Sequence, residues 1–183
     1  MGSLVLTGDT SGSVTVAVPA VAGTNTATFP ASTGTVMVSG NMPAFSAYLS
    51  ATQTISNATN TLLQFNTVTN PFGYDTASAF NTSTYSYNPK VAGYYLITAN
   101  ISGPASVTGV LNIFLYKNAS NIWTLSSLSN TAAGVVSNSS MVVYLNGSTD
   151  TIQLYAYQNS GTSQSVFGGS GNSFFQASMI RSA

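Results

Sequence analysis

Few side chains in this chain of 183 residues could carry out acid–base, nucleophilic or metal chemistry. Histidine, cysteine and glutamate do not occur, and the charged residues are Asp9, Asp75, Asp150, Lys90, Lys117 and Arg181. Proton transfer, nucleophile activation and transition-metal binding draw on the residue types that are missing or scarce here. A serine nucleophile would need histidine or lysine as its base, and nothing in the sequence brings the aspartates together as a catalytic pair. The composition therefore predicts a protein that is not an enzyme and that uses no cofactor.

Calcium is the one metal that these residues leave open. Asp75 and Asp150 each fall in a predicted turn, and calcium takes six to eight oxygen ligands, usually with several carboxylates. Copies of either residue could gather at the axis of an oligomer. The simpler expectation is that each carboxylate caps its own turn, as aspartate commonly does. We therefore predict no metal site, with Asp75 and Asp150 as weak candidates only.

The bulk composition describes a folded and electrically neutral protein. Hydrophobic residues make up 44% of the chain and aromatic residues 11%, while the formal net charge is zero. Disorder needs low hydrophobicity together with high net charge, so it is not expected. A neutral surface gives no attraction to nucleic acid or to anionic membranes, and it favours self-association. No apolar run reaches the roughly 18 residues of a membrane span, and the first residues lack the features of a cleaved signal peptide.

The apolar pattern is that of β-strands throughout. From Pro43 onward, short strands alternate with turns, and the expected strands are Ala44–Leu49, Leu62–Val68, Thr84–Asn88, Tyr94–Ser102, Val110–Lys117, Ile122–Leu128, Met141–Leu145, Thr151–Gln158 and Ser173–Ile180. In one of them Tyr95, Ile97, Ala99 and Ile101 share a face. Ile152, Leu154 and Ala156 do the same in another. Strands at this spacing, without a helical period, predict an all-β sandwich or jelly roll.

The first 42 residues differ from the rest in composition and in the length of their apolar runs. Short alternating runs, Ser13–Val18, Thr24–Phe29 and Thr35–Val38, are separated by Gly, Pro and Ser. Isolated hairpins are marginally stable in water, so we expect this arm to become ordered against other chains. We predict two parts, an attachment or stalk segment at 1–42 and a globular knob at 43–183. The candidate anchoring residues of the arm are apolar: Leu4, Val5, Val14, Val16, Val18 and Phe29.

Several motifs of the knob resemble those of the C1q/TNF-like domain. They are PAFSAYLSATQTI, LLQFNTV, the pair Tyr74-Asp75, TSTYSYNPKVAGYYLI, LYKNASNIW, Leu145-Asn146-Gly147 with Asp150, and SFFQASMI, and they cover about residues 43–183. The sequence departs from the family where Ser148 and Thr149 separate Gly147 from Asp150. The motif residues expected in the core or in a trimer interface are Phe45, Tyr48, Phe65, Tyr74, Tyr87, Pro89, Gly93, Tyr95, Gly147 and Phe174.

The resemblance implies a ten-stranded jelly roll that forms a tight homotrimer around an aromatic-rich axis. The content of ten Tyr and nine Phe residues agrees with it, because these are more than one sandwich core needs. Tyrosine suits interfaces, where the ring is dry and the hydroxyl finds a partner. The segment GDTSGSVTVAVPAVAGTNTATFPASTGTV is similar to linkers of bacteriophage tail and fibre proteins that precede a C-terminal knob. That second resemblance implies a trimeric stalk or clamp.

Together the resemblances indicate a protein of the phage virion. The favoured role is a capsid decoration (cement) protein that its arm anchors to the major capsid protein or to other virion proteins. The alternatives are a tail fibre tip that contacts a host surface receptor, and a free glycan-binding module. Trp123 and the loop tyrosines could stack on sugars, although a lone tryptophan more often packs in a core. Neither nucleic acid nor membrane insertion is expected, and the capsid surface is favoured over the tail.

Overall fold

The computed structural model describes residues 3–21, 23–28, 31, 36, 38, 42–103, 107–131 and 136–183. These residues form strands and turns, and no helix among them is long and apolar enough to cross a membrane. Contacts divide the chain into two units, Met1–Gly34 and Thr35–Ala183. The expected all-β class is confirmed.

The first unit contains a β-hairpin. Strand β1 (Ser3–Thr7) pairs antiparallel with β2 (Ser13–Ala17), and the Gly8 amide donates to the Gly12 carbonyl, 3.0 Å away, in the turn. The sequence predicted β2 but not β1, whose apolar run Leu4-Val5-Leu6 does not alternate with polar residues. The strand predicted at Thr24–Phe29 is wrong for its described residues, 24–28, which form none. Most of the strand predicted at Thr35–Val38 lies outside the described residues.

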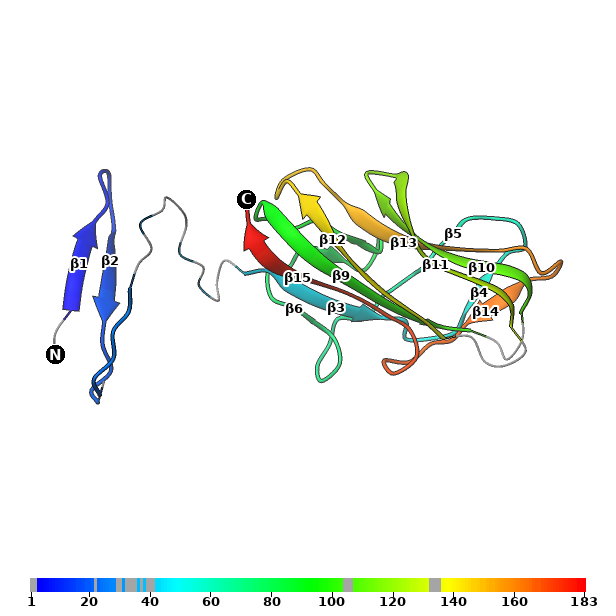
Figure 1. The fold of residues 1–183 in the computed structure, drawn as a ribbon, viewed down its shortest axis with the longest axis horizontal. Helices are drawn as coiled ribbons and strands as arrows, with labels where there is room; N and C mark the ends of the chain where they lie inside the picture. Colours follow the sequence, from blue (N-terminus) through cyan, green and yellow to red (C-terminus); the bar gives the residue numbers. More distant parts are fainter. Residues whose placement is uncertain are drawn as a thin grey trace. The chain divides into compact units, whose positions relative to one another are not determined.

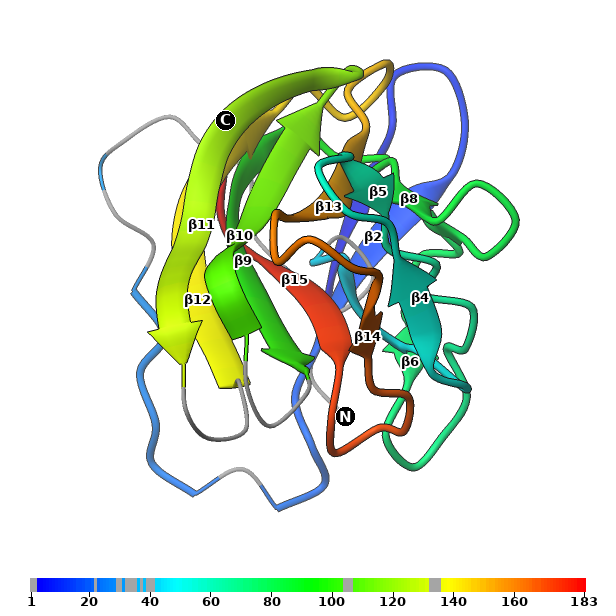
Figure 2. The ribbon, with the colours of Figure 1, turned by 90° about the vertical axis from the view of Figure 1, so that its right-hand side faces the viewer.

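The second unit is a sandwich of two antiparallel sheets (Figures 1 and 2). One sheet has the strand order β11-β10-β13-β8-β7, and β5 also pairs with β13. The strands of this sheet are β5 (Thr61–Leu62), β7 (Phe80–Asn81), β8 (Ser86–Tyr87), β10 (Val107–Lys117), β11 (Ser120–Thr131) and β13 (Ile152–Gln158). The other has the order β12-β9-β15-β3-β6, formed by β3 (Ala44–Tyr48), β6 (Tyr74–Asp75), β9 (Gly93–Ser102), β12 (Val136–Leu145) and β15 (Phe174–Ser182). A short third sheet pairs β4 (Gln53–Ile55) with β14 (Gln164–Val166).

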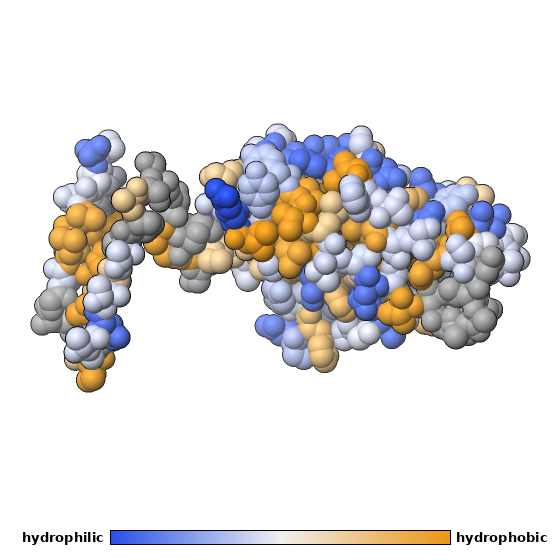
Figure 3. All heavy atoms as spheres, in the orientation of Figure 1, coloured by the Kyte–Doolittle hydropathy of each residue, from blue (hydrophilic) through white to orange (hydrophobic). Residues whose placement is uncertain are grey.

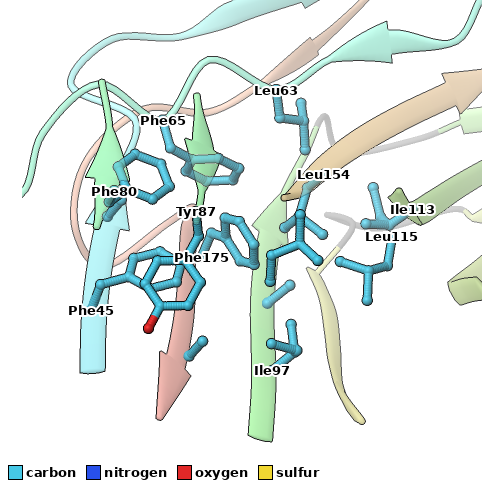
Figure 4. Close-up of a cluster of buried hydrophobic side chains, with 14 of the residues drawn as sticks. Phe45, Leu63, Phe65, Phe80, Tyr87, Ile97, Ile113, Leu115, Leu154 and Phe175 are labelled. Atoms are coloured by element: carbon cyan, nitrogen blue, oxygen red, sulfur yellow. The ribbon is translucent and has the colours of Figure 1, made fainter. Parts of the chain in front are cut away.

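The core lies between the two large sheets. The predicted inward faces of β9 and β13 are buried, and their members are Tyr95, Ile97, Ala99, Ile101, Ile152, Leu154 and Ala156. Aromatic rings fill one part of this core (Figure 4). The Phe45 ring stacks on Tyr87 at a centroid distance of 4.3 Å and meets Phe175 edge-on at 5.0 Å. Such ring pairs add stabilisation beyond the area that they bury.

The segment predicted as the strand Leu62–Val68 instead crosses from one sheet to the other. The Leu63 amide donates to the Leu154 carbonyl of β13 at 2.9 Å, and the Tyr48 amide of β3 donates to the Thr67 carbonyl at 2.9 Å. Between these contacts Leu63 and Phe65 are fully buried. The alternating apolar residues of this segment therefore mark two side chains that enter the core where the chain passes between the sheets. They do not mark a strand that is paired along its length.

Candidate interaction surfaces

Asp75 caps the turn that follows β6. Its Oδ2 accepts a hydrogen bond from the Phe80 amide at 2.7 Å, and its Oδ1 accepts one from the Ala77 amide at 3.3 Å. The carboxylate therefore orders its own loop, which is the simpler of the two roles that the sequence left open.

Asp150 is held by an ion pair and by two neutral donors. Its Oδ2 lies 2.8 Å from Lys117 Nζ and 2.9 Å from the Asn146 amide, while Asn118 Nδ2 donates to Oδ1 at 2.9 Å. Burial alone would raise the pKa of Asp150, but these donors outweigh it and hold the pKa below its ordinary value. The charge of the carboxylate is thus satisfied within the protein.

The structure does not bring the two weak metal candidates together. Asp75 belongs to the sheet that contains β3, whereas Asp150 precedes β13 in the other sheet. Within the described ranges, no cluster of three or more His, Cys, Asp or Glu side chains could hold a metal ion. Calcium at an oligomer axis stays an untested hypothesis.

The motif residues separate into a buried set and a surface set. Phe45, Phe65, Tyr87 and Tyr95 are fully buried, and Pro89 and Gly93 are buried beside them. Tyr48 and Phe174 pair across β3 and β15 and are half-buried, while Tyr74 of β6 is exposed. Gly147 lies in the turn before Asp150. Only the surface set is placed to meet another molecule.

A cluster of exposed apolar side chains lies on the outer side of the β12-β9-β15 sheet. We call it the sheet face, and it comprises Tyr94, Leu96, Val142, Tyr144 and Ile180. Leu96 lies opposite Val142 in the β9–β12 register, and the rings of the next pair, Tyr94 and Tyr144, are 5.5 Å apart. Apolar atoms are visible over this part of the sheet (Figure 3). Each of these side chains is between 38% and 54% exposed.

Sequence reasoning missed the sheet face, although a signal for it exists. Residues 94–97 and 141–145 are apolar or aromatic at every position, not at every second one. Strands that are covered on both faces show such continuous runs, whereas strands with one wet face alternate. The continuous runs therefore indicate that the outer side of this sheet is also meant to be covered.

The hairpin carries a second apolar surface, which we call the arm face: Leu4, Leu6, Val14 and Val16. In the β1–β2 register Leu4 lies opposite Val16, and Leu6 lies opposite Val14, so the four side chains share one side. Each is more than half exposed. Leu6 was missed by sequence reasoning because β1 was not predicted.

The other predicted anchoring residues fall elsewhere. Val5 pairs with Thr15 on the opposite side of the hairpin, and Val18 is exposed just after β2. Phe29 lies outside the described residues.

Comparison with known proteins identifies the fold. No family model matches the sequence, and no curated protein matches it. Similar solved structures include the globular domain of zebrafish complement 1qA (19% identity, TM-score 0.54), which covers 77% of this chain and 98% of that one. Murine APRIL at pH 8.5 (12%, TM-score 0.56) covers 76% of this chain and 99% of that one. The Eiger TNF of S. frugiperda (12%, TM-score 0.55) covers 78% and 93%.

These likenesses confirm the expected fold class, the C1q/TNF-like jelly roll. At such low identity they establish the fold alone.

Proposed function

We propose that this chain is a structural protein of a bacteriophage virion, a trimeric decoration protein whose arm fixes a jelly-roll knob to the capsid. The observation that carries the proposal is the arm face, an aliphatic surface on a hairpin. The hairpin belongs to a different structural unit from the knob. A two-stranded hairpin is marginal by itself, so an exposed aliphatic side on one favours a docking role. The similarity of this segment to phage fibre linkers supplies the kind of partner.

The occupant proposed for the sheet face is a second copy of the same chain. The face pairs Tyr94 with Tyr144, which are rings with a polar tip, and adds the aliphatic side chains of Leu96, Val142 and Ile180. Full burial of such a side chain stabilises by about 1.5–3 kcal/mol before ordering costs. Because the chain has no net charge, copies do not repel one another as they approach. Three copies are the number that the family resemblance implies.

The occupant proposed for the arm face is an apolar groove on the capsid protein. The hairpin offers only Asp9, in its turn, as a charged group, so the contact would depend on burial of aliphatic surface and on the free edges of β1 and β2. A single hairpin buries little area. Three arms joined by one trimeric knob would add avidity.

The composition of the chain supports a role in the coat of a particle. The neutral composition, without histidine, suits a coat that keeps its charge state around neutral pH.

The test is attachment of purified chains to phage particles that lack this protein. A Leu6→Thr/Val14→Thr variant keeps β-forming residues in the hairpin but makes the arm face polar. We expect unchanged knob trimers and at least a tenfold loss of co-sedimentation with particles. The matched control, Val5→Thr, changes the opposite side and should attach normally. Full attachment of the double variant would contradict the anchoring role.

A further inference from the structure

We propose that the knob carries a binding site for an uncharged saccharide on β11, the end strand of its sheet, centred on Trp123. This site is separate from the arm face and the sheet face, and it does not depend on where the chain sits in a particle. The local backbone, the exposed indole and the polar groups beside it support this assignment.

A β-bulge sets the geometry of the site. Strand β11 is the last strand of its sheet, and Leu115 of β10 pairs with Trp123 while the next residue, Tyr116, pairs with Asn121. Ile122 is therefore one residue too many on β11. Bulges at sheet edges bend the strand and redirect side chains, and they are enriched beside functional sites.

The indole of Trp123 is exposed where a tryptophan would normally be covered. Its exposed fraction is 57%, and its neighbour Ile122 is also exposed, at 38%. Together with Asn121 and Thr124 these residues line a shallow, open hollow of about 460 Å³. A flat aromatic surface beside a hollow suits a pyranose ring, whose C–H face can lie on the indole.

The polar side chains of the hollow have unused hydrogen-bonding capacity. Asn121 Oδ1 accepts from the Trp123 amide at 3.1 Å, which orients the Asn121 amide group and leaves its two N–H donors unused. In the part of the chain that the structure describes, neither Asn121 Nδ2 nor the Thr124 hydroxyl bonds to another group. The Asn121 amide can donate hydrogen bonds, and the Thr124 hydroxyl can donate and accept them. Both groups can therefore bind the hydroxyl groups of a sugar.

The charges around the hollow select for a neutral sugar. None of its four lining residues is charged. Lys117, the last residue of β10 before the turn into β11, contacts the Asp150 carboxylate and the Tyr144 carbonyl, each within 3 Å. A sialic acid, uronic acid or phosphorylated sugar would bring an anion without a counter-charge, so binding should favour uncharged hexose or N-acetylhexosamine units.

The chain contains a single tryptophan, so its fluorescence reports this site alone. We would titrate the full chain with neutral di- and trisaccharides of glucose, galactose, mannose and N-acetylglucosamine, and with matched acidic oligosaccharides. The expected result is a saturable emission change with at least one neutral sugar and a response at least tenfold weaker with its acidic counterpart.

Calorimetry with the best sugar then tests the residues. Trp123→Ala should weaken binding at least tenfold, Asn121→Ala and Thr124→Ala should weaken it several-fold, and the control Phe72→Ala, an exposed aromatic elsewhere, should leave it unchanged. Three outcomes would overturn the proposal: no saturable response to any neutral sugar, full binding by Trp123→Ala, or emission that follows protein concentration alone, which would assign the indole to contact between copies.

Discussion

At the scale of single residues, two neighbouring tyrosines of the core differ in how their hydroxyls are satisfied. The rings of Tyr87 and Tyr95 lie 5.9 Å apart, and both side chains are fully buried. Tyr95 donates its hydroxyl hydrogen to the Val91 carbonyl at 2.7 Å. The Tyr87 hydroxyl is buried and makes no well-formed hydrogen bond within the described residues, although the nearby Tyr95 hydroxyl interacts with it. A buried polar group without a partner costs free energy, whereas a bonded one does not.

This difference predicts opposite effects of the same substitution. Tyr87→Phe should leave the free energy of unfolding unchanged or raise it, by up to about 1 kcal/mol, because it removes an unsatisfied group. Tyr95→Phe should lower it by about 0.5–1.5 kcal/mol, because it deprives the Val91 carbonyl of its donor. Urea unfolding of the two variants measures both values. A larger loss for Tyr87→Phe than for Tyr95→Phe would contradict the assignment.

Asp150 gives the second prediction at this scale, a loss of stability in acid. Its pKa is lower in the folded chain than in an unfolded one, so its contribution is present above the unfolded value of about 3.9 and is lost as the pH falls through the folded value. We expect the free energy of unfolding to be flat from neutral pH to about pH 5 and to fall below about pH 4. Asp150→Asn should lower the free energy of unfolding by about 1–3 kcal/mol at pH 7 and should reduce its further fall below about pH 4. If the fall below pH 4 were as large in Asp150→Asn as in the wild type, this role would be contradicted.

At the scale of elements, the turn between β12 and β13 shows how a polar loop is fixed without many charges. Asn146 Oδ1 accepts hydrogen bonds from the amides of Ser148, Thr149 and Asp150 at 2.9–3.0 Å. Gly147 within it has φ +71°, and a Cβ there would collide with the backbone of Val91 and Ala92. The extra residues Ser148 and Thr149, which depart from the family pattern, are thus accommodated by Asn146.

Gly147→Ala should therefore destabilise the knob by more than about 1 kcal/mol, through the positive φ and the collision together. Gly171→Ala is the matched control, because nothing lies within 4 Å of a Cβ at that position; it should change stability little. Thermal unfolding of both variants makes the comparison. Equal midpoints for the two would contradict the account of this turn.

Elements were predictable where a strand has one buried face. Strand β13 and the later part of β9, residues 97–102, were predicted because their inward residues alternate with more polar ones, and alternation is visible in sequence. Strand β1 was missed because Leu4-Val5-Leu6 does not alternate, and its identity depends on pairing with β2. Likewise the two-residue strands β6 and β7 are defined by their partners and carry no periodic signal of their own. The arm face needed the hairpin register, and the sheet face needed the knowledge that Tyr94 and Tyr144 are paired.

At the scale of the whole molecule, the proposal describes a neutral knob that joins its copies through one surface and its particle through another. The sheet face and the arm face are both apolar and uncharged. Each is carried by a different unit, so the two functions can be separated by substitution.

Assembly of the knob should depend on the sheet face. The wild-type chain should sediment at three times its mass of 18.8 kDa. A Leu96→Asp/Val142→Asp variant should sediment as a folded monomer, because six buried carboxylates would have to share one interface. The control Ser127→Asp/Ser163→Asp adds the same charge at other exposed positions and should stay trimeric. A trimer of the Leu96/Val142 variant would place the interface elsewhere.

The most direct test of the proposed role is an electron cryomicroscopy reconstruction of the phage particle to which the proposal assigns this chain. The account predicts three-fold knobs on the outer capsid surface, with Leu4, Leu6, Val14 and Val16 buried against the capsid protein. Knobs found only at the tail tip, or particles that lack the chain altogether, would contradict it.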